Sequence, residues 1–150
     1  MSSALDLQLL AVCKSGPLFQ AQQLVTDGAN LNCSGDMGLT PLMRALEHKQ
    51  SDIVSWLVSI KTVDVDRQNK YKNSALHYAA RYSSDGVMVA TLGNRMEDAI
   101  VNLVNHDGKT AVVQAVEWRN VSAVQGLLSV KAVDWLILDK KEKSLLTIAR

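Results

Sequence analysis

Net charge of either sign is nearly absent from this sequence. Its 150 residues carry 16 lysine and arginine side chains against 15 aspartate and glutamate side chains, which gives a formal net charge of +1. Nucleic acids are bound largely through their phosphates, so a chain without an excess of basic residues is a poor candidate for binding them. We therefore expect no nucleic-acid partner.

Long apolar runs are also absent. A helix that spans a bilayer needs about eighteen or more consecutive apolar residues, and no segment approaches that length. The N-terminal stretch MSSALDLQLLAVC contains a short apolar run, but no basic segment precedes the run and Asp6 lies at its edge. This start is therefore predicted to be a helix of the domain, and not a signal peptide. We expect no membrane insertion.

Cysteine is scarce, and the chain has no recognisable catalytic group. Cys13 and Cys33 lack the spacing of metal ligands, and free thiols favour a reducing compartment, cytoplasmic or nuclear. Gly108-Lys109-Thr110 is similar to the end of a phosphate-binding loop, but Leu103 stands where that loop needs its first glycine. Three histidines have no acidic or cysteine neighbour at ligand spacing: His48, His77 and His106. We predict no enzymatic activity, no metal and no cofactor.

An internal repeat is the strongest feature that is present. Residues 38–66 and 108–136 are identical at ten of twenty-nine aligned positions. A weaker copy lies between them, because Leu76 follows Leu42 by 34 residues and precedes Val112 by 36. Leu9 and Leu146 extend the series in both directions. A fixed period of this length is typical of repeat proteins. It predicts about four and a half units in one domain: 1–34, 35–68, 69–104, 105–138 and a partial 139–150.

Each unit is predicted to contain two short helices and a turn. In the second unit Pro41 suits the first position of a helix, and Thr40 suits the N-cap before it. The segment 51–60 has a wide apolar stripe that includes Trp56, which predicts a second helix with a buried tryptophan. Helices this short cannot bury their stripes alone, so neighbouring units must stack. The predicted fold class is an all-α helical repeat solenoid. Trp135 is expected to pack at the base of a hairpin.

The unit resembles the ankyrin repeat, with its pattern D-x-x-G-x-T-P-L-H-x-A-A-x-x-G. The best matches are GLTPLMRAL, SALHYAA, HDGKTAVVQAV and LVTDGANLN, which together extend over essentially the whole chain. The resemblance implies helix-turn-helix units joined by β-hairpin-like loops. It also implies that His77, at the histidine position of the pattern, braces its turn with a hydrogen bond.

The sequence departs from the ankyrin pattern at several places. Lys72 and Glu142 replace the turn glycine, so these two hairpins are expected to deviate from the tight geometry. Lys61 and Thr62 replace the closing Gly-Ala of the second unit. Three extra residues fall within 83–98, which makes the second helix of the third unit the hardest to place. The fifth unit is incomplete: either it is a shortened cap or, as we expect, the natural protein continues beyond Arg150.

The resemblance implies a non-enzymatic protein–protein interaction module, which binds a protein partner through a concave groove and the hairpin tips. We expect it to be intracellular and monomeric on its own. Two alternatives remain open: a regulatory ankyrin segment of a larger enzyme or channel, and a stand-alone inhibitor.

Two positions that follow the small residues of each first helix are candidates for the binding groove. Equivalent positions of stacked units lie about 10 Å apart, so rings at the second position would form a row. The rings of this row are His48, Tyr82 and Trp118. Alternatively, Tyr82 and Trp118 pack on neighbouring turns and cover gaps left by the irregular third unit. The first position alternates in charge through Glu47, Arg81 and Glu117. These charges either contribute to the groove or form a solvated row with weak pairs between repeats, each below about 1 kcal/mol.

The hairpin tips form a second candidate patch. The second unit is predicted to expose Met37 and Leu39, and the third to expose Tyr71. Exposed apolar tips favour a contact role. Polar residues are expected at the later tips: His106, Lys109, Lys140, Lys141 and Lys143.

Overall fold

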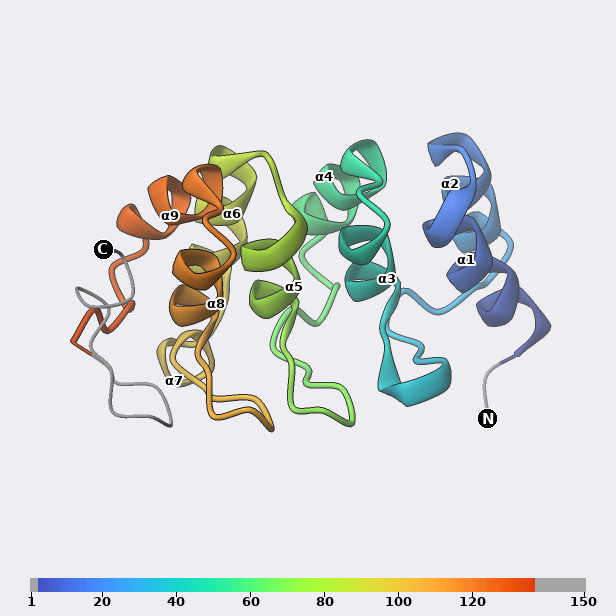
Figure 1. Ribbon diagram of the computed structural model, residues 1–150. Helices are drawn as coiled ribbons and strands as arrows, with labels where there is room; N and C mark the ends of the chain where they lie inside the picture. The colour runs from blue at the N-terminus through green and yellow to red at the C-terminus, as the bar shows by residue number, and fades with distance from the viewer. Residues whose placement is uncertain (1–2, 137–150) are drawn as a thin grey trace.

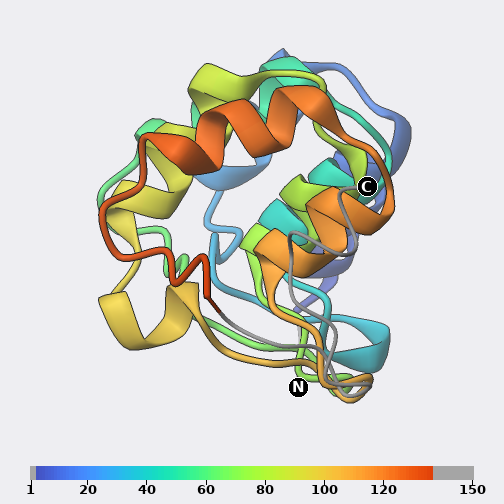
Figure 2. The same cartoon turned by 60° about the vertical axis from the view of Figure 1, so that its left-hand side comes forward.

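The computed structural model describes residues 3–136 as four helical pairs that lie side by side (Figure 1). Figure 2 shows two layers, with the first helices of the pairs in one and the second helices in the other. The predicted all-α repeat solenoid is confirmed. The pairs are α1 (Ala4–Ser15) with α2 (Leu18–Thr26), α3 (Pro41–Glu47) with α4 (Ser51–Ser59), α5 (Ala75–Tyr82) with α6 (Gly86–Arg95), and α8 (Ala111–Glu117) with α9 (Val121–Leu128).

The first helices begin at the predicted polar caps. The Thr40 hydroxyl accepts a hydrogen bond from the backbone N–H of Met43 at 3.2 Å, and Pro41 occupies the first turn of α3. Thr110 repeats this arrangement, accepting from Val113 N–H at 3.3 Å. Such caps satisfy an N–H that has no partner within the helix. The sequence therefore determines where these helices start.

The core lies between neighbouring pairs. Leu42, Leu76 and Val112 each occupy the second residue of a first helix and are buried, so the predicted register of the repeats is confirmed. Trp56 and Trp135 pack against the core, as predicted, but both rings remain partly exposed.

The third unit accommodates its extra residues without losing its second helix. After α6, the chain forms a further short helix, α7 (Asp98–Val101), beside the loops (Figure 1). The Arg95 guanidinium at the end of α6 donates to three backbone oxygens of the second unit: Val58 at 2.6 Å, Val63 at 2.9 Å and Lys61 at 3.3 Å. These bonds link α6 to the end of α4.

Glycines allow α6 and α9 to approach closely. A side chain on Gly86 would place its Cβ 2.6 Å from the backbone oxygen of Ser122. A Cβ on Gly126 would collide with the backbone oxygen of Gly86 and lie 2.9 Å from the Val89 Cβ. The two helices are therefore packed backbone to backbone, which no larger residue permits.

The loops extend to one side of the helices as hairpin-like turns, beginning with the short 3-10 helix η1 (Asp36–Gly38). The prediction that Lys72 distorts its hairpin is wrong. Lys72 adopts the left-handed conformation, φ 61°, as Gly108 does at φ 71°. The Lys72 N–H bonds to the Asn69 oxygen at 2.9 Å, and the Gly108 N–H bonds to the Asn105 oxygen at the same distance. The hairpin keeps its shape, and the lysine backbone bears the strain.

The predictions for the fifth unit, including Leu146, Glu142 and the three lysines of its tip, lie outside the described residues.

Candidate protein-binding groove

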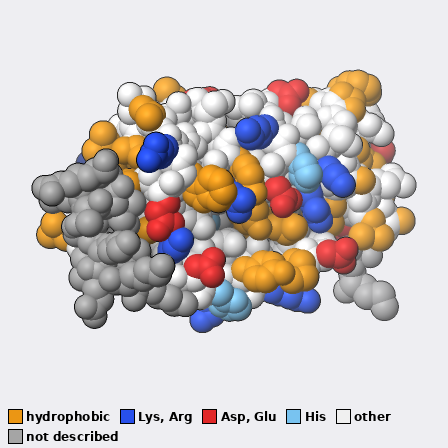
Figure 3. Space-filling model, viewed as in Figure 1, with side chains coloured by type: hydrophobic (Ala, Val, Ile, Leu, Met, Phe, Trp, Pro, Cys, Tyr) orange, Lys and Arg blue, Asp and Glu red, His pale blue; other side chains and the backbone are white. Residues whose placement is uncertain are grey.

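The face formed by α1, α3, α5 and α8 carries the candidate groove. Figure 3 views this face and shows hydrophobic side chains mixed with charges of both signs across its middle. A hollow of about 210 Å³ lies where α3, the third hairpin, α5 and α8 meet. Its lining contains carboxylate, guanidinium, amide and phenol groups from three successive units. These residues are Glu47, Tyr71, Asn73, His77, Tyr78, Arg81, Tyr82 and Gln114.

The three rings of the predicted row occupy equivalent places at the ends of first helices. His48 and Trp118 are the C-caps of α3 and α8, and Tyr82 is the last residue of α5. Trp118 is 54% exposed, whereas His48 and Tyr82 are half-buried. The ring–ring contacts within residues 3–136 involve other pairs, namely Tyr78 with Tyr82 and Tyr71 with His106. The row is therefore present in position, but its members do not stack directly on one another.

Arg81 joins two members of the row. Its guanidinium carbon lies 5.0 Å from the centroid of the Tyr82 ring and 4.2 Å from the centroid of the Trp118 ring. Both distances fit cation–π contacts. Tyr78 extends the group by stacking on Tyr82, with ring centroids 6.3 Å apart. We call Tyr78, Arg81, Tyr82 and Trp118 the ring cluster; it connects α5 to the next repeat.

Tyr78 has a structural polar contact. Its hydroxyl accepts a hydrogen bond from the Asn69 side-chain amide at 2.8 Å. Burial, with a smaller contribution from the negative charge of Glu47, raises the pKa of Tyr78 to about 12. The phenol therefore remains neutral at physiological pH.

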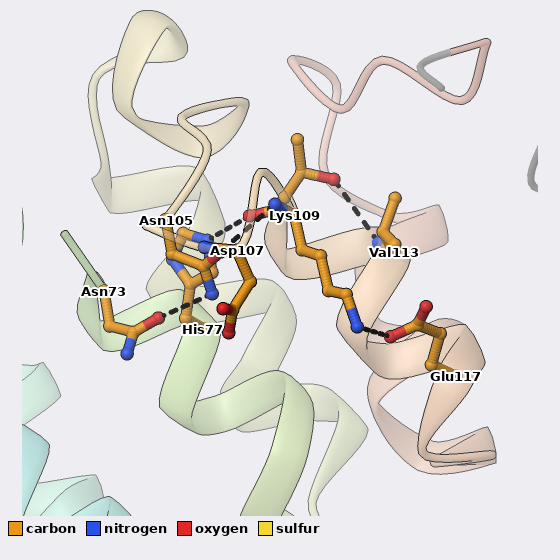
Figure 4. A network of polar contacts seen from close by, with 8 residues as sticks. Asn73, His77, Asn105, Asp107, Lys109, Val113 and Glu117 are labelled. Atoms are coloured by element: carbon orange, nitrogen blue, oxygen red, sulfur yellow. Dashed lines mark hydrogen bonds and ion pairs between the residues drawn. The ribbon is translucent and has the colours of Figure 1, made fainter. Parts of the chain in front are cut away.

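The acidic residues beside the rings form ion pairs within their own repeats. The Glu47 carboxylate lies 3.5 Å from Nε2 of His48 and 4.0 Å from the Arg44 guanidinium. Glu117 pairs with the Lys109 ammonium at 2.6 Å (Figure 4). Within residues 3–136 the alternative of weak pairs between repeats is not found, because each carboxylate lies beside a cation of its own unit.

The hairpin tips match the prediction at two of three apolar positions. Met37 is 39% exposed and Tyr71 is 49% exposed. The prediction for Leu39 is wrong, since its side chain is only 8% exposed. Leu39 directly precedes the N-cap Thr40, and an apolar side chain at that position folds against the helix that follows. Successive tips are joined by backbone hydrogen bonds from Lys70 N–H to the Met37 oxygen and from His106 N–H to the Tyr71 oxygen.

His77 braces its turn as predicted and also connects two repeats. Its Nδ1 accepts from the Ser74 N–H at 3.1 Å. Its Nε2 lies 3.0 Å from the backbone oxygen of Lys109, and both residues are drawn in Figure 4. A carbonyl oxygen can only accept, so Nε2 carries the ring proton. Burial lowers the pKa of His77, which keeps the imidazole neutral.

Two asparagines that sequence reasoning missed organise the hairpins. Asn69 Oδ1 accepts the N–H groups of Tyr71 and Asn73, both at 3.0 Å. Asn105 repeats this pattern and also donates to the Asn73 side chain at 2.9 Å (Figure 4). Each asparagine stands five residues before the N-cap of its repeat, and this recurrence was the available signal.

The candidate metal ligands and thiols can be located in the part of the chain that the structure describes. Residues 3–136 contain no group of three or more His, Cys, Asp or Glu side chains that could hold a metal ion. Cys13 and Cys33 are buried and not joined in a disulfide, and burial raises their pKa values to about 12 and about 11. Thiols with such values are poor nucleophiles. Among the described helices, none has the length and apolar character that a bilayer crossing requires.

Comparison with known proteins identifies the repeat. Residues 9–92 match the family model described as ankyrin repeats (3 copies). The chain is 30% identical to the nuclear factor NF-kappa-B p105 subunit of Rattus norvegicus over 102 residues, 68% of this chain and 10% of that protein. It is 33% identical to neurogenic locus notch homolog protein 2 of Homo sapiens over 108 residues, 72% of this chain and 4% of that protein. The chain thus spans a tenth or less of these relatives. It belongs to the ankyrin repeat family.

Proposed function

We propose that this chain is a protein-binding module whose contact surface is the groove of the third and fourth units, centred on the ring cluster, with the tips at Met37 and Tyr71 as a second contact. Ankyrin repeats are protein–protein interaction modules, and membership of that family supports the general function. The position of the binding surface on this chain is our inference from the side chains.

The observation that carries the proposal is the exposure of Trp118. More than half of the Trp118 surface is exposed to solvent, although its ring is in contact with the Arg81 guanidinium. Exposed apolar surface is costly in water unless a partner covers it, and tryptophan and arginine are common among residues that dominate binding energy. A contact that restricts the ring before binding reduces the conformational entropy that it loses when a partner binds.

The neighbouring side chains give the surface its selectivity. Glu47, Gln114 and Tyr71 line the hollow beside the ring cluster and offer both donors and acceptors. Apolar contact at the centre with polar groups at the rim is the usual organisation of a protein interface. Two buried thiols without a disulfide, Cys13 and Cys33, fit action in a reducing compartment.

The proposal is tested by affinity capture with mass spectrometry on three forms of the full chain. We expect the double variant Tyr82→Ala/Trp118→Ala to lose partners that the wild type captures, with binding weakened by about 2 kcal/mol or more. Phe19→Ala is the matched control, because Phe19 is a large ring on α2 that is 72% exposed and lies outside the groove. Equal capture by all three forms would contradict the proposal.

A further inference from the structure

Arg81 is a cation without a carboxylate partner in the described part of the chain. Within residues 3–136, the ion pairs of this face join Glu47 to Arg44 and Glu117 to Lys109, so the two carboxylates beside the rings each have a cation of their own repeat. The hydrogen bonds of these residues also leave the Arg81 guanidinium without an acceptor. The side chain is exposed and lines the hollow between α3, α5 and α8.

The surroundings of Arg81 hold its guanidinium in place while leaving its hydrogen-bond donors available. The group lies over the rings of Tyr82 and Trp118, 5.0 Å and 4.2 Å from their centroids. Ring contacts engage the faces of a guanidinium, whereas its five N–H donors point outward in its plane. The two ring contacts restrict the side chain, and among the described residues no acceptor meets its donors. A fixed planar fork of this kind is suited to a carboxylate, which it binds through two parallel hydrogen bonds.

We propose that Arg81 receives a carboxylate of the bound partner, an Asp or Glu side chain whose apolar neighbour packs on Trp118. This inference rests on the proposed function and specifies the chemistry of the partner at one position. A single guanidinium matches the single charge of a carboxylate, whereas phosphorylated residues are typically recognised by clusters of arginines. The nearby cations Arg44 and Lys109 are already paired with Glu47 and Glu117.

The test is a selection of random displayed peptides of about twelve residues on the full 150-residue chain. We expect the selected peptides to share an Asp or Glu beside an apolar residue. Arg81→Gln should weaken their binding about tenfold or more, since a charged hydrogen-bonded pair at an interface is lost. Peptides selected on Arg81→Glu should carry Lys or Arg in place of the acidic residue.

Lys14→Gln is the matched control for general electrostatic attraction. Lys14 is exposed, precedes the same turn in the first unit, and its replacement changes the net charge equally. We expect it to leave the affinity of the selected peptides nearly unchanged. Equal losses for Lys14→Gln and Arg81→Gln, or no loss for either, would overturn the assignment of Arg81.

Further outcomes separate this inference from the proposed function. Peptides that require Trp118 but bind Arg81→Gln as well as wild type would overturn the inference and leave the proposed function intact. Failure to select any peptide that requires Trp118 would contradict both. In a further comparison, the acidic residue of a selected peptide is replaced by Gln or by phosphoserine. If only the phosphoserine form binds in a way that depends on Arg81, the group that Arg81 receives is a phosphate and not a carboxylate.

Discussion

Nε2 of His77 in α5 lies 3.0 Å from the backbone oxygen of Lys109 in the hairpin of the next repeat. The same ring accepts the Ser74 N–H through Nδ1. One buried imidazole therefore fixes the start of its own helix and connects the third repeat to the fourth. Because Met43 and Val113 occupy the equivalent positions of the second and fourth units, this junction differs chemically from its neighbours.

The stability of the domain should fall as the pH drops below neutrality. Burial lowers the pKa of His77 in the folded chain, so the unfolded chain, with a pKa of about 6.5, binds the proton first. The free energy of unfolding is therefore highest above about pH 7. It falls as the pH drops toward the pKa of His77 in the folded chain, by up to about 1.4 kcal/mol per pH unit. Urea unfolding at about pH 7.5 and about pH 5.5 measures this difference.

Two variants assign that pH dependence to His77. His77→Gln should unfold at lower urea than wild type at both pH values, but with a smaller difference between them. Val121→Ala changes an exposed side chain that does not titrate and should retain the wild-type difference. An unchanged difference in His77→Gln would contradict the assignment.

Replacing Lys72 by glycine should stabilise the domain. Lys72 holds a left-handed backbone, φ 61°, where two other hairpins have Gly38 and Gly108 at φ 76° and 71°. That conformation costs a non-glycine residue about 1–2 kcal/mol, and the greater freedom of unfolded glycine offsets part of the gain. We expect the free energy of unfolding in urea to rise by about 0.5–1 kcal/mol for Lys72→Gly.

Gly108→Ala provides the opposite test at an equivalent turn. It introduces a Cβ at positive φ and should lower the free energy of unfolding by about 1 kcal/mol or more. If both substitutions shift stability in the same direction, backbone strain is not what distinguishes these turns.

Gly126→Ala should destabilise the domain although alanine favours helices. The new Cβ would collide with the backbone of Gly86 and approach the Val89 Cβ, so α6 and α9 would have to separate. Extra volume in a packed contact destabilises a protein by about 1–3 kcal/mol, whereas the higher helix propensity of alanine stabilises it by about 1 kcal/mol. Thermal unfolding should therefore show a lower Tm. Val121→Ala, at an exposed position on the same helix, should change the Tm little.

Features set within one repeat could be predicted from the sequence. Thr40 and Pro41 identified the start of α3, because capping depends on a residue and its immediate successors. Leu42, Leu76 and Val112 identified the packed face, because helical spacing determines which side chains point toward the neighbouring unit.

Features that depend on the contact between repeats could not be predicted in the same way. The alternating charges of Glu47, Arg81 and Glu117 suggested ion pairs between repeats. In the structure, Arg81 instead lies over the ring of Trp118 at the end of α8, and Glu117 pairs with Lys109. The close packing of α6 against α9 likewise depends on Gly86 and Gly126, which face each other from adjacent units. Only the stacked arrangement brings such residues together.

In the proposed function, Trp118 is exposed in order to bind a partner and contributes little to the stability of the fold. The most direct measurement compares wild type with Trp118→Ala, recording the Tm of each protein and, by titration calorimetry, the Kd of each for a peptide selected on the wild type. We predict nearly equal Tm values and a Kd weakened by about thirtyfold, equivalent to about 2 kcal/mol. A marked fall in Tm with an unchanged Kd for the folded protein would contradict the account.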